Sequence, residues 1–404
     1  MTSGAHLLPN LSAEEGEDWR SRLSQPAVTT TLQLWRWLFG QPTRVLERDL
    51  EELPWPDAFG ERSSEPAFDW LENSGGFVPW LRTPEASAHP AGGVDRGADR
   101  SLSRAVMRVH DKAFAHRVAL DAGLLPGDLG ELIAVLEPET LRDPDLALAT
   151  IEQQLARWPE WTGRRFTLKP RFGSSGRGRV AGAHGRADVP EVRGALARLA
   201  DRGGALLEPW LDRSVDLSAQ LHVSESGEIR MLGTLELITS ASGLPLGHRG
   251  GIDSKGRVNS ENIRDEAMRE AAVVLARAAH AEGFHGPCGV DGFAYRGPDG
   301  RSELRPVVEF NARFTLGIIA LGLLRRGRGT LNSRLGLEPG IQCYFHFGLE
   351  APAPSWEQAL VSAGDAALLI PLWRKGEKLC PAILFATRRE ALDPIAAAAR
   401  SRSA

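Results

Sequence analysis

Three glycines lie close together at Gly173, Gly176 and Gly178. Because glycine adopts dihedral angles that strain other residues, the backbone N–H groups of such a turn can converge on an anion. The same stretch supplies hydroxyl, guanidinium and ammonium groups at Ser174, Ser175, Arg177 and, just before it, Lys169. It matches neither a Walker A loop nor a dinucleotide fingerprint. We interpret it as a phosphate-binding loop, and the alternative is a plain β-turn.

A second group of residues could bind a metal ion. In the segment Val-Val-Glu-Phe-Asn, Glu309 and Asn311 are two positions apart on a predicted strand, so both side chains point to one face. Asp291 is expected on the partner strand. Two carboxylates and an amide oxygen are hard ligands, which suit Mg²⁺ rather than zinc. The alternative is a solvated Asp291 and a salt-bridged Glu309.

Several predicted elements would position these residues. The residues 165–169 are predicted to form a strand that leads into the glycine turn, and Asp111 is predicted to cap a helix that begins at Lys112. Strict alternation of apolar and polar residues predicts a half-buried strand over 215–223. The remaining predictions are a helix from 101 toward 120, a helix over 264–282 that stops at Gly283, a hairpin of 288–295 with 304–313, a short strand over 382–385, and an Ala-rich terminal helix.

Composition restricts the class of protein. The chain has 404 residues, 48 basic and 52 acidic side chains and a net charge of −4, so no overall field attracts nucleic acid or anionic lipid. The apolar run 315–324 is about half of the ~20 residues that a membrane span requires. Cys288, Cys343 and Cys380 are widely spaced, which argues against disulfides. We therefore expect a soluble cytoplasmic protein without a nucleic-acid or membrane partner.

The first 100 residues are rich in Trp, Pro and Gly, and we expect an α/β lobe there. Their aromatic side chains could form a binding box, but packing in the core is the more ordinary role. These tryptophans are Trp19, Trp35, Trp37, Trp55, Trp70 and Trp80.

In their order along the chain, these elements resemble the ATP-grasp superfamily, over residues 106–324. The resemblance implies two α+β lobes that close on ATP. Asp111-Lys112 followed by 122–126 matches the element that supplies the first phosphate-binding lysine, and the second falls on Lys169. The family's adenine-binding strand is similar to Glu208-Pro-Trp-Leu211, so the resemblance assigns Glu208, Trp210 and Leu211 to adenine and Asp216 to the ribose. It places the metal ligands on Asp291, Glu309 and Asn311.

One position departs from the family pattern. Many members carry an arginine two residues before the first metal carboxylate, where it steadies an acyl-phosphate, and this chain has Gly289 there. Arg249 and Arg313 are the available replacements, although each could be a simple ion-pair residue.

The resemblance implies an α+β or α/β chain with four parts: an N-terminal α/β lobe (1–105), a small lobe with the glycine loop (106–210), a larger lobe with the metal hairpin (211–328) and a C-terminal α/β extension (329–404). The implied activity is a ligase that uses ATP and Mg²⁺, with Mn²⁺ as an alternative ion, to activate a small-molecule or peptide carboxylate for attack by an amine. A kinase and a non-catalytic ATP-binding protein are the alternatives. Specificity is expected in the N-terminal lobe and in loops over 236–253, and the oligomeric state stays open.

Overall fold

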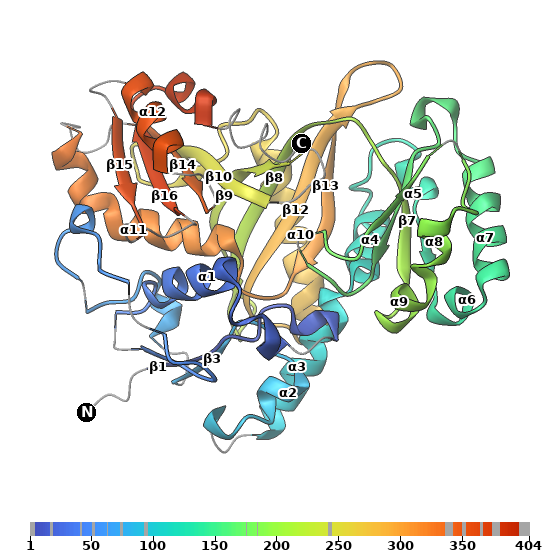
Figure 1. Cartoon of the computed structure of the whole chain (residues 1–404), viewed down its shortest axis with the longest axis horizontal. Helices are drawn as coiled ribbons and strands as arrows, with labels where there is room; N and C mark the ends of the chain where they lie inside the picture. Colours follow the sequence, from blue (N-terminus) through green and yellow to red (C-terminus); the bar gives the residue numbers. More distant parts are fainter. Residues whose placement is uncertain are drawn as a thin grey trace.

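The computed structural model describes residues 5–16, 19–40, 43–50, 53–62, 64–72, 76–92, 96–174, 176–183, 185–240, 245–335, 342–349, 353–363, 367–373 and 380–395. In this part of the chain, three sheets form three regions of the molecule (Figure 1). No helix among these residues has the length and apolar character needed to cross a membrane.

The N-terminal region is built on a small parallel sheet in the order β2-β1-β3. Its strands are β1 (Ala5–Leu8), β2 (Thr43–Val45) and β3 (Phe77–Pro79), and its helices are α1 (Pro26–Arg36), α2 (Pro84–Ser87) and α3 (Arg96–His110). Trp35 is fully buried, and its ring meets the rings of Trp80 and Phe314 edge to face at 5.4 and 5.1 Å. Trp19, Trp35, Trp37 and Trp80 are buried in the core, and Trp55 and Trp70 are partly buried against it. Core packing is thus their main role, although Trp80 also lines the cavity described below.

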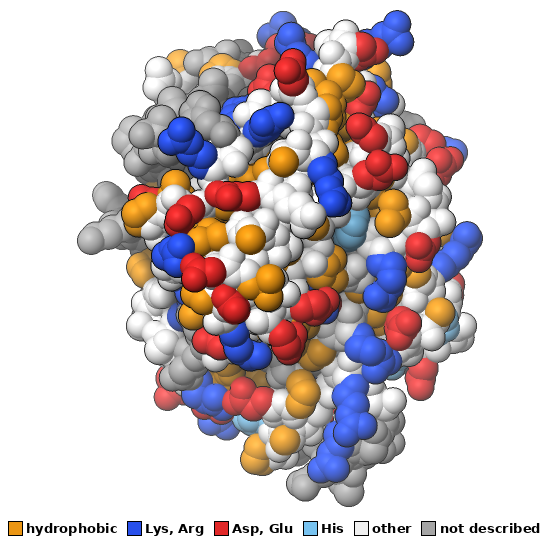
Figure 2. All heavy atoms as spheres, turned by 90° about the vertical axis from the view of Figure 1, so that its right-hand side faces the viewer, with side chains coloured by type: hydrophobic (Ala, Val, Ile, Leu, Met, Phe, Trp, Pro, Cys, Tyr) orange, Lys and Arg blue, Asp and Glu red, His pale blue; other side chains and the backbone are white. Residues whose placement is uncertain are grey.

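The second region is a four-stranded antiparallel sheet in the order β4-β7-β5-β6. Its strands are β4 (Ala134–Leu136), β5 (Phe166–Pro170), β6 (Val180–Gly182) and β7 (Ala205–Pro209). The helices of this region are α4 (Lys112–Asp121), α5 (Leu129–Leu132), α6 (Pro138–Arg142), α7 (Pro144–Ala156), α8 (Pro190–Arg193) and α9 (Leu196–Asp201). The glycine turn joins β5 to β6. Both charge signs are scattered over the face that this region presents in Figure 2.

The third region is a large sheet, nine-stranded among the described residues, with the order β13-β12-β8-β9-β10-β14-β16-β15 and β11 beside β10. Its strands are β8 (Arg213–Val223), β9 (Ile229–Thr239), β10 (Pro245–Ile252), β11 (Val258–Asn259), β12 (Gly286–Arg296), β13 (Ser302–Asn311), β14 (Cys343–Gly348), β15 (Ala367–Pro371) and β16 (Ala382–Ala386). Helices α10 (Asp265–Ala281) and α11 (Leu316–Arg334) pack on its strands, and α12 (Ala353–Ala363) packs on β15 and β16.

Local sequence signals explain most of these elements. Asp111 accepts a hydrogen bond of 2.8 Å from the Ala113 N–H, so it caps α4 as predicted. Gly283 ends α10 with φ of +88°, and the predicted hairpin is the β12–β13 pair. The expectation of loops over 236–253 was wrong, because this stretch holds the end of β9 and all of β10. The predicted terminal helix falls mainly on 396–404, outside the described residues.

Candidate active site

One cavity of about 420 Å³ lies where the three regions meet. The glycine loop, the β12–β13 hairpin and the loop after β1 all contribute to its wall. The predicted site residues that line it are Lys112, Lys169, Gly173, Ser174, Gly176, Asp216, Asp291, Glu309, Asn311 and Arg313. Ser175 lies outside the described residues. The turn and the acidic hairpin, which lie more than 100 positions apart in the sequence, therefore face the same space.

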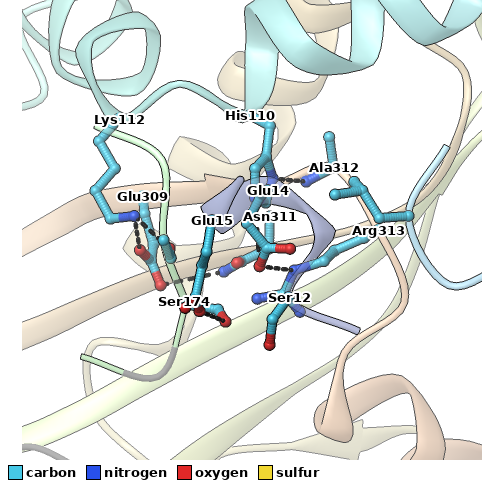
Figure 3. Close-up of polar contacts among 12 residues, drawn as sticks. Ser12, Glu14, Glu15, His110, Lys112, Ser174, Glu309, Asn311, Ala312 and Arg313 are labelled. Atoms are coloured by element: carbon cyan, nitrogen blue, oxygen red, sulfur yellow. Dashed lines mark hydrogen bonds and ion pairs between the residues drawn. The ribbon is translucent and has the colours of Figure 1, made fainter. Parts of the chain in front are cut away.

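Lys112 contacts both the glycine loop and the acidic hairpin, which line the cavity from distant parts of the sequence. Its ammonium donates a hydrogen bond of 2.7 Å to the Gly173 carbonyl and lies 3.2 Å from the Glu309 carboxylate (Figure 3). Arg171 follows β5 and binds Asp111 through its Nε, 3.0 Å from each carboxylate oxygen. Because Asp111 directly precedes Lys112, this ion pair fixes the start of α4 beside the glycine loop.

The glycine loop depends on left-handed backbone at Gly176 and Gly178, with φ of +69° and +76°. A Cβ at Gly178 would lie 2.5 Å from the Arg202 guanidinium, so a side chain there would displace Arg202. Arg177 turns away from the cavity centre onto Glu15, with Nε and Nη2 at 2.9 and 2.6 Å from its Oε1. The loop is thereby tied to the N-terminal region.

The candidate metal ligands meet on adjacent strands. Asp291 on β12 is paired in register with Glu309 on β13. The Asn311 amide donates to Asp291 at 2.9 Å and to Glu309 at 3.5 Å. Among the described residues no group of three or more His, Cys, Asp or Glu side chains is placed to hold a metal ion. The candidate site offers two carboxylates and an amide.

Electrostatics show that this set suits a cation. Burial raises the pKa of Asp291, and the nearby Glu309 carboxylate raises it further. Burial would also raise the pKa of Glu309, but Lys112, Lys169 and Arg313 outweigh burial and lower it. A divalent cation would relieve the repulsion between the two carboxylates, and their oxygens are hard donors that fit Mg²⁺.

The second predicted lysine belongs to a buried ion-pair group. Lys169 contacts Glu208, whose other oxygen accepts a hydrogen bond of 2.8 Å from Arg305. Burial lowers the pKa of Lys169 to about 8 despite the Glu208 charge. Arg305 and Lys169 offset the burial of Glu208 and lower its pKa to about 2.

The residues expected to bind adenine are not on the wall of the cavity. The Glu208 side chain is 2% exposed and bound to cations. The backbone N–H of Trp210 donates a hydrogen bond of 2.8 Å to the Arg165 carbonyl. Leu211 is buried in the core of the small region. The Glu208 side chain is thus held by cations and the Trp210 backbone N–H by Arg165, and the assignment of this segment to adenine stays a prediction.

Arg249 also lies away from the cavity. It pairs with Glu236 and Asp393, each at 2.8 Å, while the preceding His248 lines the cavity. Successive side chains of a strand point to opposite faces, which accounts for the difference. Of the two arginines considered as replacements at Gly289, the cavity contains only Arg313. The proposed catalytic role of Arg249 therefore lacks structural support.

Sequence reasoning missed several polar residues of the cavity. Ser218 donates a hydrogen bond of 2.5 Å to Asp291, and Gln220 donates one of 2.6 Å to Ser218. The alternation along β8 carried the signal, because Asp216, Ser218 and Gln220 share its polar face. That face borders the cavity rather than open solvent. Other polar residues of the wall that it missed include Ser12, Glu14, Arg179 and Arg213.

Asp216, the predicted ribose ligand, does line the cavity. Its carboxylate already accepts hydrogen bonds from Arg213 at 3.0 Å and from Thr239 at 2.7 Å. The guanidiniums of Arg179 and Arg213 lie 4.5 and 5.1 Å from the Trp210 ring centroid. Trp210 thus supports two arginines of the wall from behind.

No family model matches the chain, and no curated protein matches it by sequence. Similar solved structures include carboxyaminoimidazole ribonucleotide synthase from Aspergillus clavatus complexed with ATP, at 15% identity and a TM-score of 0.51 over 100% of both chains. The same enzyme with ADP and 5-aminoimidazole ribonucleotide gives 14% identity and a TM-score of 0.50, again over 100% of both chains.

Another similar structure is the biotin carboxylase domain of 2-oxoglutarate carboxylase from Hydrogenobacter thermophilus, in complex with MgADP, ADP and bicarbonate. It is 13% identical with a TM-score of 0.50, over 97% of this chain and 88% of that one. At identities this low, structural similarity establishes the architecture alone. The three regions of this chain agree with that architecture. The chain has the ATP-grasp fold.

Proposed function

We propose that this protein is an ATP- and Mg²⁺-dependent ligase that activates a carboxylate as an acyl-phosphate for attack by an amine. The observation that carries the proposal is the shared cavity of the glycine loop and the acidic hairpin, bridged by Lys112. Among the described residues of its wall, six side chains are basic (Lys112, Lys169, Arg177, Arg179, Arg213 and Arg313) and four are acidic (Glu14, Asp216, Asp291 and Glu309). This excess of positive charge suits a triphosphate.

Each group has a role in this scheme. Asp291, Glu309 and Asn311 would hold Mg²⁺, which neutralises phosphate charge when it is bound. Lys112, Lys169 and the loop around Gly173 would hold the phosphates in line for attack by a carboxylate oxygen on the γ-phosphorus. Arg313 is the cation beside the metal pair that could steady the acyl-phosphate. The tether of the loop to Glu15 would help to keep water from this reactive intermediate.

The related structures support this choice of chemistry over others. One holds MgADP together with bicarbonate, and another holds ADP together with 5-aminoimidazole ribonucleotide, whose name includes an amino group. Bicarbonate is therefore a reasonable first carboxylate to test, along with small organic acids.

The test is a coupled assay of ADP release over a panel of carboxylates, each with and without amines, in Mg²⁺ and in EDTA. We expect ADP and phosphate only when Mg²⁺, a carboxylate and an amine are all present. Glu309→Gln should abolish the release, while the exposed control Glu228→Gln should not change it. Phosphate retained on the acceptor would indicate a kinase. ATP binding without turnover across the panel would indicate a non-catalytic protein.

A further inference from the structure

Two consecutive acids follow the central strand of the N-terminal sheet and have different surroundings. Glu14 and Glu15 form a short 3-10 helix (Ala13–Glu15) and are both buried. Glu15 accepts hydrogen bonds from Ser174 at 3.0 Å and from Arg177. Neither carboxylate oxygen of Glu14 has a hydrogen-bond partner among the described residues.

The nearest cations do not satisfy Glu14. Its Oε1 is 3.6 Å from Arg313 Nε and 4.0 Å from His110 Nε2, and both distances exceed a hydrogen bond (Figure 3). The Arg313 Nε also lacks a hydrogen-bond partner in the described part of the chain. The Glu14 side chain is only 1% exposed, so a donor for its oxygens has to come from the cavity that it lines. A buried carboxylate that has a nearby cation but no hydrogen-bond donor within bonding distance is costly, which makes the arrangement poorly explained by stability alone.

Glu14 nevertheless carries a charge near neutral pH. Burial acts to raise its pKa, but Arg313, His110, Ser174 and the backbone together outweigh burial and keep the pKa below its usual value. Burial lowers the pKa of His110 to about 4, so the imidazole is neutral at pH 7. The Ala312 N–H donates to His110 Nδ1 at 3.2 Å, which leaves the imidazole proton on Nε2. Glu14 thus offers an anion beside one guanidinium.

The position of Glu14 in the fold independently points to a ligand. In the strand order β2-β1-β3, the chain passes from β1 to β2 on one side of β1 and then crosses to β3 on its other side. In open parallel sheets, ligands bind beyond the carboxyl end of the strands at such a reversal. Glu14 lies in the loop that follows this end of β1 and lines the same cavity as Glu309 and Asn311. Apolar side chains of the N-terminal region, Leu11, Val28 and Trp80, line it too.

The geometry points to Glu14 as the residue that binds the amine of the second substrate, a primary amine on a partly apolar body. This inference rests on the proposed ligase function. An amine N–H would satisfy the Glu14 oxygens, while Arg313 would hold the carbonyl oxygen of the acyl-phosphate. The amine nitrogen then bonds to the acyl carbon, the bond from that carbon to the phosphate oxygen breaks, and the departing phosphate takes the amine proton. The short separation of these two side chains matches the approach of a nucleophilic nitrogen to an acyl carbon.

The test compares Glu14→Gln with Glu15→Gln, because the two acids are adjacent and equally buried but differ in partners. With an amine identified by the ADP-release assay, we expect Glu14→Gln to raise the KM for the amine about tenfold or more. The KM values for ATP and the carboxylate should change less than about twofold. Glu15→Gln should instead affect ATP and leave the amine KM unchanged. An unchanged amine KM in Glu14→Gln overturns the assignment.

Two further measurements keep this result interpretable. If Glu14→Gln does not fold, Glu14→Asp retracts the carboxylate by one methylene and should still raise the amine KM. If the wild-type protein releases no ADP with any substrate, the ligase proposal fails, and binding of butylamine, benzylamine and phenethylamine is measured by calorimetry with Mg·ADP present. Binding that Glu14→Gln abolishes supports the amine site. Equal binding to both proteins, or none to the wild type, rejects it.

Discussion

The side-chain amide of Gln220 occupies the space beside Gly289 that a side chain at that position would need. A Cβ built at Gly289 lies 3.0 Å from Gln220 Oε1 and 3.2 Å from Thr315 Cγ2. Thr315 donates a hydrogen bond of 2.5 Å to Gln220, so the two side chains support each other. A side chain at position 289, such as the arginine that the ATP-grasp pattern leads one to expect, would therefore require Gln220 or Thr315 to shift.

Substitution of Gly289 tests this packing. We expect Gly289→Ala to lower the free energy of unfolding by about 1 to 3 kcal/mol, because the new methyl group forces Gln220 or Thr315 to move. Urea titration of the purified variant measures the change. The double variant Gly289→Ala with Gln220→Ser should recover much of the loss, and a single variant as stable as the wild type would contradict the explanation.

Replacement of Asp291 by Asn should separate stability from activity. In EDTA at pH 8 we expect Asp291→Asn to raise the free energy of unfolding by about 1 kcal/mol, because it removes one of two repelling buried carboxylates. Mg²⁺-dependent ADP release should be lost in the same variant. Thermal unfolding with and without Mg²⁺ gives the comparison. A less stable metal-free variant would show that the carboxylate pair is not under electrostatic stress.

The lowered pKa of Lys169 predicts that kcat/KM for ATP depends on pH. Its pKa of about 8 lies below the ordinary lysine value, so the ammonium is present below pH 8 and is lost as the pH rises through that value. If this charge binds phosphate, kcat/KM for ATP should fall about tenfold per pH unit above 8. Lys169→Arg should keep its charge and move the decline to higher pH. A profile that is flat to pH 9.5 in the wild type would refute the role.

The buried group around Glu208 should contribute to stability. Glu208→Gln leaves Arg305, which is 2% exposed, and Lys169 without their anion. We expect a loss of about 3 to 5 kcal/mol in the free energy of unfolding. Glu228→Gln, on the exposed turn between β8 and β9, serves as the matched control with a change near zero. Denaturant titration of both variants provides the measurement, and equal stabilities would mean that the ion pairs are energetically neutral.

Local sequence patterns predicted the elements whose structure depends mainly on residues that are close together in the sequence. The alternation in 215–223 gave β8, and Asp111 gave the start of α4, because pleat and capping depend on neighbours in sequence. The acidic pair was also predictable, since Glu309 and Asn311 share a face of one strand. The facing position of Asp291 followed from a hairpin with a recognisable turn.

Long-range contacts escaped the same reasoning. The hydrogen bond from Ser174 to Glu15 joins residues 159 positions apart, and no periodic pattern in the sequence predicts it. Arg305 is buried on β13 because Glu208 on another sheet neutralises it, which only the packed structure reveals. Arg249 is an available cation in the sequence, but on its strand it points to the face of Glu236 and not to the cavity.

Some neighbouring strands of the large sheet are far apart in the sequence and are therefore synthesised at different times. Strand β10 pairs with β14, and β14 pairs in turn with β16. A nascent chain that has emerged only to residue 335 would contain the whole acidic hairpin yet leave one edge of β10 without its β14 partner, a template for association with other chains. We infer that the part of the molecule with the acidic hairpin stays vulnerable to aggregation during synthesis until β14 and β16 have paired.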